Sequence, residues 1–109
     1  VCVHIEAPDE ASHEGDAAAK VKAIEEIDAK IVAPLAEHLA VAGEHRILVC
    51  PDHPTFIATK THSRGGVPFV IAGTGVGHSG QAAYHEGSAA AAGDSVLPGW
   101  TLMGEFLKR

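Results

Sequence analysis

The sequence predicts an α/β fold with a mainly parallel sheet and flanking helices. Short apolar runs rich in β-branched residues occur at Val1–Ile5, Arg46–Cys50 and Val67–Ala72, which is the pattern of strands. Between the first two runs, residues 17–42 carry apolar side chains at three- and four-residue spacing, as amphipathic helices do. Strand, helix and strand in this order form a βαβ unit, whose crossover should be right-handed.

Composition limits the protein class. The chain has 109 residues, of which 46% are hydrophobic and 20% charged, as in one small globular domain. A net charge of −6 without a Lys/Arg cluster argues against a nucleic-acid partner. No run of about 18 apolar residues predicts a membrane span, and no signal peptide opens the chain. We therefore expect a cytoplasmic protein, in which Cys2 and Cys50 are reduced core residues.

The beginning of the chain indicates a fragment of something longer. The only methionine is Met103, and the first residues lie inside an expected buried strand. Domain boundaries usually fall in polar, flexible linkers instead. We therefore treat residues 1–109 as part of a larger protein.

The N-terminal half is expected to contain one interrupted helix. Pro8 should end the first strand, and residues 9–16 read as a polar loop. Asp16 is a suitable N-cap, Pro34 should kink or split the helix, and Gly43 should end it. The apolar face of the helix consists of Val21, Ile24, Ile27, Ile31, Leu35 and Leu39.

The C-terminal half is less regular. Arg46–Cys50 is apolar from Ile47 onward, as in a central parallel strand, and Pro51–Gly66 is a long polar loop of a functional or disordered kind. The glycine-rich residues 73–80 fit neither a P-loop nor a dinucleotide fingerprint, so we expect a surface loop there. Residues 82–93 are too rich in Ala and Gly to assign, and Leu97–Leu107 should form a short closing helix.

Two acid/histidine clusters carry the chemical signal. One contains Asp9 and His13, and the other contains Asp52 and His53, followed shortly by His62. Each cluster comes just after an expected strand, and ligand sites of open α/β sheets form at the carboxyl ends of strands. Carboxylate and imidazole are ligands of divalent transition metals. Taken alone, each pair is more often a turn, a cap or a solvent-facing loop than a metal site, because short motifs frequently match by chance.

Several segments resemble the archaeal-type, cofactor-independent phosphoglycerate mutases of the alkaline phosphatase superfamily. The resemblance covers nearly the whole chain, with its motifs in the family's order. The segments that carry it are Val3–Asp16, Lys20–Asp28, Pro51–Thr55, Lys60–Arg64, Val67–Phe69, Tyr84–Glu86 and Leu102–Leu107.

The resemblance implies a two-metal phosphotransfer site in an alkaline phosphatase-like, doubly wound fold. By similarity, Asp9, His13 and His62 bind one metal, and Asp52 and His53 bind the other. Such an Asp/His set favours Mn²⁺ or Zn²⁺, with Mg²⁺ as a third candidate. Residues 1–109 would be the C-terminal metal-binding part of the mutase domain. The family takes its nucleophilic serine from an N-terminal portion that this chain lacks.

The implied function is interconversion of 3-phosphoglycerate and 2-phosphoglycerate through a phosphoserine, with the chain inactive by itself. One alternative is a superfamily relative that acts on another substrate, such as a homoserine kinase-like protein or a phosphohydrolase. Another is a non-catalytic metal-binding or interaction module. We also expect self-association through an exposed sheet edge. None of the serines lies in the context of the family's nucleophile: Ser12, Ser63, Ser79, Ser88 and Ser95.

Overall fold

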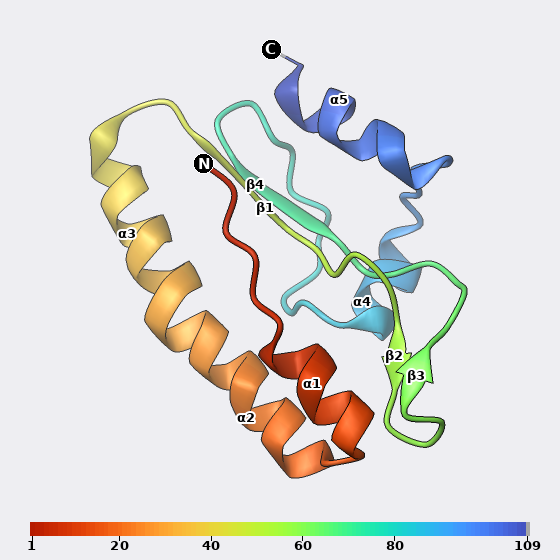
Figure 1. The fold of residues 1–109 in the computed structure, drawn as a ribbon. Helices are drawn as coiled ribbons and strands as arrows, with labels where there is room; N and C mark the ends of the chain where they lie inside the picture. Colours follow the sequence, from red (N-terminus) through yellow and green to blue (C-terminus); the bar gives the residue numbers. More distant parts are fainter. Residues whose placement is uncertain (109) are drawn as a thin grey trace. The chain divides into compact units, whose positions relative to one another are not determined.

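The computed structural model describes residues 1–108 as an α/β chain with two compact units (Figure 1). The first unit consists of residues 1–41 and 53–66, and the second of residues 42–52 together with residues from 67 onward. Each unit is described here by itself. Among the described residues, no helix has both the length and the apolar character needed to cross a bilayer.

The first helix of the first unit, α1 (Ala7–Glu14), corrects the predicted polar loop. Pro8 occupies the first turn, where its missing N–H is not needed, and Asp9 and Glu10 place acidic groups at the positive end of the helix. Gly15 ends the helix in a left-handed conformation, φ 80°, and its N–H bonds back to the last turn. These residues at the two ends favour a helix, although the segment has no apolar face.

The second helix begins as predicted. The Asp16 carboxylate accepts a hydrogen bond from the Ala19 N–H at 2.9 Å, and α2 spans Ala17–Ile27. Its apolar face was expected to be buried, but Val21 and Ile24 are more than half exposed, and no α2 residue is buried.

At Pro34 the structure shows a widened turn in place of the predicted kink or split, and the helix continues to Ala42. A π-helical stretch, η1 (Asp28–Val32), joins α2 to α3 (Ala33–Ala42). Pro34 cannot donate to the carbonyl four residues earlier and its ring crowds that carbonyl, so a wider turn relieves the clash. Gly43, with φ 116°, follows the last helical residue, which confirms the predicted stop.

The expected long loop at 51–66 contains a short hairpin. Strand β2 (Thr55–Phe56) pairs antiparallel with β3 (Thr61–His62), with Thr55 opposite His62. Among the described residues of this unit, few are buried, namely Ala11, Ser12 and Thr55, and of these only Ser12 is fully buried.

The predicted strand at Val1–Ile5 is wrong. The segment has no strand assignment, and Val1 and Val3 are exposed. β-branched residues favour a strand only where a neighbouring strand accepts their backbone hydrogen bonds, and no described strand pairs with this segment.

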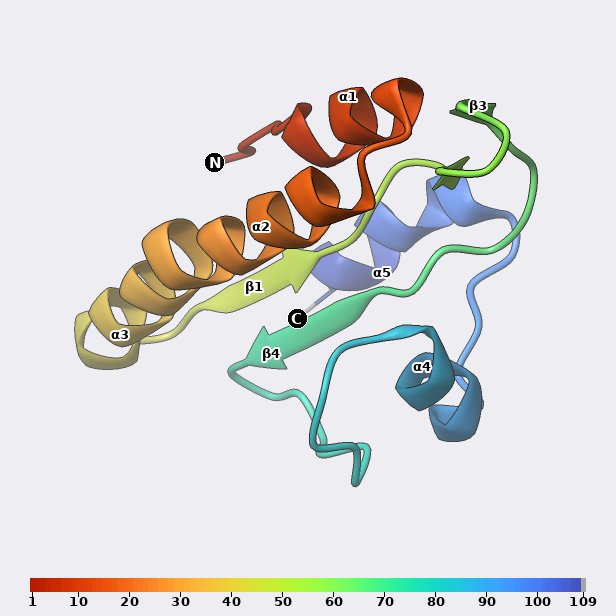
Figure 2. The same cartoon turned by 90° about the horizontal axis from the view of Figure 1, so that it is seen from below.

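The second unit contains a two-stranded sheet whose direction differs from the prediction. Strand β1 (Arg46–Val49) pairs antiparallel with β4 (Val70–Gly73), and Figure 2 shows the two strands side by side in opposite directions. The mainly parallel sheet is therefore wrong for the described strands. Apolar composition indicates a buried strand but does not fix the direction of its partner.

Three short helical segments complete the second unit. They are α4 (Glu86–Ala92), the 3₁₀ turn η2 (Gly99–Thr101) and α5 (Leu102–Leu107), the last of which confirms the predicted closing helix. The Arg46 guanidinium donates to the Phe106 and Lys108 carbonyls, so it satisfies backbone acceptors at the end of α5.

The two cysteines also differ from expectation. Cys2 and Cys50 form no disulfide, as predicted, but both are exposed and neither belongs to a core.

Tyr84, the only tyrosine of the chain, lies half-buried in the second unit. Its hydroxyl donates to the Pro68 carbonyl at 2.9 Å. Burial, with a smaller contribution from the Cys50 thiolate, raises the pKa of Tyr84 to about 12.

Tyrosinate absorbance should therefore appear near pH 12 in the folded chain and near pH 10 in denaturant. The raised pKa means that the fold loses stability as pH rises above 10, because the unfolded chain then releases a proton that the folded chain retains. Ultraviolet titration with parallel circular dichroism tests this, with Tyr84→Phe as the blank. Ionisation near pH 10 with the circular dichroism unchanged would contradict it.

Candidate metal centre

Helix α1 places Asp9 and His13 one turn apart on the same face. His13 Nε2 lies 3.2 Å from Asp9 Oδ2. The i, i+4 spacing of the sequence produces this contact as soon as the segment is helical. The helix thus brings together the two residues of the first predicted cluster.

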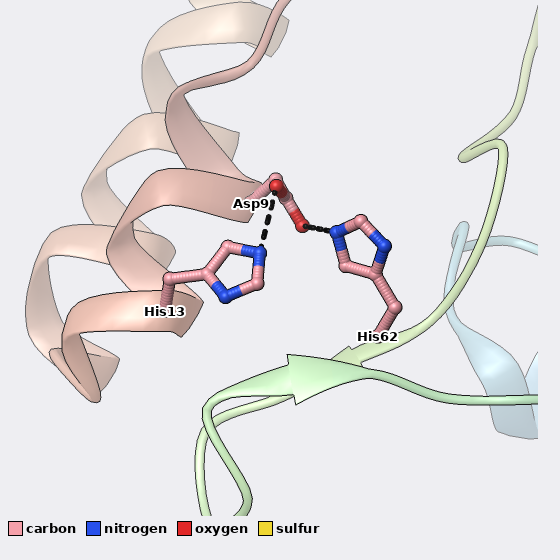
Figure 3. A group of neighbouring side chains, drawn as sticks. All are labelled: Asp9, His13 and His62. Carbon is pink, nitrogen blue, oxygen red and sulfur yellow. Dashed lines mark ion pairs between the residues drawn. The ribbon is translucent and has the colours of Figure 1, made fainter.

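The β2–β3 hairpin supplies the third member. His62 in β3 points its Nε2 atom at Asp9 Oδ1, 3.5 Å away. Figure 3 shows both imidazoles directed at the one carboxylate, His13 from α1 and His62 from the hairpin. The three candidate ligand atoms lie within 4.8 Å of one another.

Lys60 fastens the hairpin to α1 at two points. Its carbonyl accepts a hydrogen bond from His13 Nδ1 at 2.9 Å, and its ammonium donates to the Glu14 carbonyl at 2.9 Å. The ammonium thereby meets the negative end of the helix dipole. Lys60 has φ 54°, and its side chain runs so close to Gly15 that a Cβ atom there would lie 2.5 Å from Lys60 Cε.

The position of the His13 proton leaves a ring nitrogen with a lone pair that can bind a cation. Because a carbonyl can only accept, His13 Nδ1 carries a proton, and Nε2 of the neutral ring has a lone pair. That lone pair faces a carboxylate oxygen at 3.2 Å, so two acceptors confront each other unless a proton or a metal ion lies between them. The donor set therefore fits a divalent metal.

The charge of Asp9 suits the same role. A hydrogen bond from Thr55 lowers the pKa of Asp9 below its usual value of 3.8; desolvation opposes this shift, and the charges of His13 and His62 support it. The carboxylate is therefore ionised at neutral pH. Ligand atoms around a tetrahedral ion are about 3.3–3.6 Å apart, and the two carboxylate–imidazole separations are 3.2 and 3.5 Å. One carboxylate and two imidazoles would leave a fourth position open, as in catalytic zinc sites.

The structure brings some of the five predicted ligands together. Asp9, His13 and His62 form one group. His53 adjoins it, because its ring lies on that of His62 with centroids 3.9 Å apart. Asp52 belongs to the second compact unit, and its ligand role stays a prediction.

Lys60 and Thr55 lie at the centre but had no role in the sequence interpretation. They appeared there only as members of the segments that resemble the family. No sequence pattern marks either residue, because their contacts with the centre form only when the hairpin meets α1.

The chain is similar to a protein family and to several known proteins. The Metalloenzyme superfamily model matches residues 1–97. A protein from Geobacter sulfurreducens named probable 2,3-bisphosphoglycerate-independent phosphoglycerate mutase is 46% identical over all of this chain and 28% of its own length. A protein from Methanothrix thermoacetophila named 2,3-bisphosphoglycerate-independent phosphoglycerate mutase is 47% identical over 91% of this chain and 26% of its own length.

A third relative, the 2,3-bisphosphoglycerate-independent phosphoglycerate mutase from Methanosarcina acetivorans, is 54% identical over 65% of this chain and 18% of its own length. The chain thus spans less than a third of the length of these curated relatives. No solved structure gives a significant match.

Replacing Gly15 by alanine should loosen the centre. A left-handed alanine costs about 1–2 kcal/mol, and its Cβ would displace the Lys60 side chain that holds the hairpin on α1. We expect urea denaturation to show a loss of about 1–2 kcal/mol in the free energy of unfolding. Gly66→Ala is the matched control, because Gly66 has no neighbour within 4 Å of the added atom. Equal stabilities of the two variants would contradict the role of Gly15.

Proposed function

The chain belongs to the Metalloenzyme superfamily, and from that premise we propose that it is the metal-binding part of a 2,3-bisphosphoglycerate-independent phosphoglycerate mutase. The convergence of Asp9, His13 and His62 on one point carries this proposal. The names of the similar proteins supply its reaction.

The proposed centre has two divalent ions, Mn²⁺ or Zn²⁺ ahead of Mg²⁺. Asp9, His13 and His62 hold the first, and Asp52 and His53 contribute to the second. Two such ions would offset phosphate charge and hold the attacking and leaving oxygens of a phosphoryl transfer. Within the chain, Lys60 holds His13 in the tautomer that offers Nε2, and the hydrogen bond from Thr55 lowers the pKa of Asp9.

In the proposed whole enzyme, a serine outside this sequence accepts the phosphoryl group of phosphoglycerate and returns it to the neighbouring hydroxyl. The serines of this chain have other environments. Ser12 is fully buried and donates to the Pro8 carbonyl, and Ser88 bonds to the ring of His85, the N-cap of α4. We further propose that the complete enzyme has the doubly wound, alkaline phosphatase-like fold and works in the cytoplasm.

Calorimetric titration with Mn²⁺ and Zn²⁺ at neutral pH tests the metal centre. We expect about one ion to bind per chain at the three-ligand group, and Asp9→Ala and His62→Ala to abolish this binding, since two remaining ligands hold such an ion weakly. His38→Ala is the control, because His38 is an exposed histidine outside the group. Binding that is indifferent to Asp9 and His62 would refute the assignment, provided that circular dichroism shows the variants folded.

Activity should require the remainder of the enzyme. The purified chain with Mn²⁺ should not convert 3-phosphoglycerate into 2-phosphoglycerate, because the proposed nucleophile lies outside it. A chimera that carries this chain in place of the matching segment of the Geobacter sulfurreducens relative should convert it, and Asp9→Ala should remove the activity. His38→Ala in the chimera controls for nonspecific damage. Turnover by the chain alone, or a folded but inactive chimera, would count against the proposal.

A further inference from the structure

We propose that Thr55 is a positioning residue of the metal centre, whose hydroxyl orients Asp9 and fixes which ring nitrogen His53 offers to a metal. The inference rests on the proposed function. It concerns a residue that touches ligands of both proposed metal ions without being a ligand itself.

Thr55 is held rigidly at the base of the hairpin. Its side chain is buried, only 6% exposed, and lies in β2 opposite His62. Its carbonyl accepts a hydrogen bond from the Lys20 ammonium of α2 at 2.9 Å. The hydroxyl is therefore placed by the hairpin and by α2 together, which suits a group that must hold others in position.

The hydroxyl has one proton and two polar neighbours. Asp9 Oδ1 lies 2.5 Å from Thr55 Oγ1, and His53 Nδ1 lies 3.2 Å from it. Hydrogen bonds to an ionised acceptor are shorter than neutral ones, so the proton of Thr55 points at the Asp9 carboxylate. Thr55 can then only accept from His53.

This assignment determines the tautomer of His53. Because Thr55 Oγ1 accepts, His53 Nδ1 must carry the proton, and the lone pair of the neutral ring is on Nε2. His53 is thus prepared to bind a metal through Nε2, as the Lys60 carbonyl prepares His13. Groups that accept a hydrogen bond from the other ring nitrogen orient metal-binding histidines and increase their basicity.

One hydroxyl consequently connects the two proposed ligand sets. Asp9 belongs to the first set and His53 to the second, and Thr55 contacts both. The rings of His53 and His62 are also in contact, so a shift of His53 would press on a ligand of the first ion. We expect loss of the hydroxyl to weaken metal binding although every ligand remains.

The decisive variants are Thr55→Val, which keeps the shape and removes the hydroxyl, and Thr55→Ser, which keeps the hydroxyl. Thr61→Val in β3 is the matched control, because Thr61 is an exposed threonine of the same hairpin. Calorimetry with Mn²⁺ and Zn²⁺ should show affinity about 10- to 100-fold lower for Thr55→Val. Thr55→Ser and Thr61→Val should stay within a few-fold of the parent chain. Unchanged affinity in a folded Thr55→Val variant would overturn the proposal.

A second measurement needs no metal. Long-range ¹H–¹⁵N spectra of the metal-free chain at about pH 8, where histidine is neutral, report the tautomer of each ring, and His53→Gln assigns the His53 signals. We expect His53 to carry its proton on Nδ1, and the Thr55→Val variant to lose this preference. A parent His53 protonated on Nε2 would refute the proposal even if Thr55→Val does not fold. If the parent chain binds no metal, the metal assignment fails, while the spectra still decide the role of Thr55.

Discussion

The first compact unit depends on the contacts that the Asp9 carboxylate makes. A hydroxyl from β2 and two imidazoles, one from α1 and one from β3, all face its two oxygens within 3.5 Å. The hydrogen bond that the Thr55 hydroxyl donates to this ionised carboxylate joins β2 to α1, and the approach of His62 brings β3 to the same group. The same convergence that holds α1 to the hairpin creates the candidate metal centre.

Polar contacts have this importance because the unit buries little apolar surface. Its only buried hydrophobic residue among those described is Ala11, whereas Val21 and Ile24 of α2 are largely exposed. Apolar burial contributes about 25 cal/mol per Å², so an exposed stripe adds little to stability. The hydrogen bonds of Lys20 and Lys60 to backbone carbonyls connect α2, the hairpin and α1 instead. A bound cation would add to the same network, since ligands that bind the folded state stabilise it.

Local signals predicted the helical part of the fold. The Asp16 cap and the stop at Gly43 each follow from the covalent properties of one residue, and both are confirmed, whereas at Pro34 the helix widens and is not split. The strand at Val1–Ile5 and the parallel sheet were wrong, because strand formation and direction depend on a partner distant in sequence. Helix α1 escapes prediction from apolar periodicity because its signals lie at its two ends.

The candidate site, like the fold, could be predicted from the sequence only in part. The spacing of Asp9 and His13 predicts their contact, but His62 is brought to them by a hairpin that composition did not reveal, so only the family resemblance joined the three. The two histidine anchors also differ in kind. A backbone carbonyl orients His13, so that function survives changes of the Lys60 side chain as long as the turn geometry is kept. The Thr55 hydroxyl contacts His53 Nδ1, and this contact depends on one side-chain atom. The candidate centre thus relies on backbone geometry beside His13 and on side-chain chemistry beside His53.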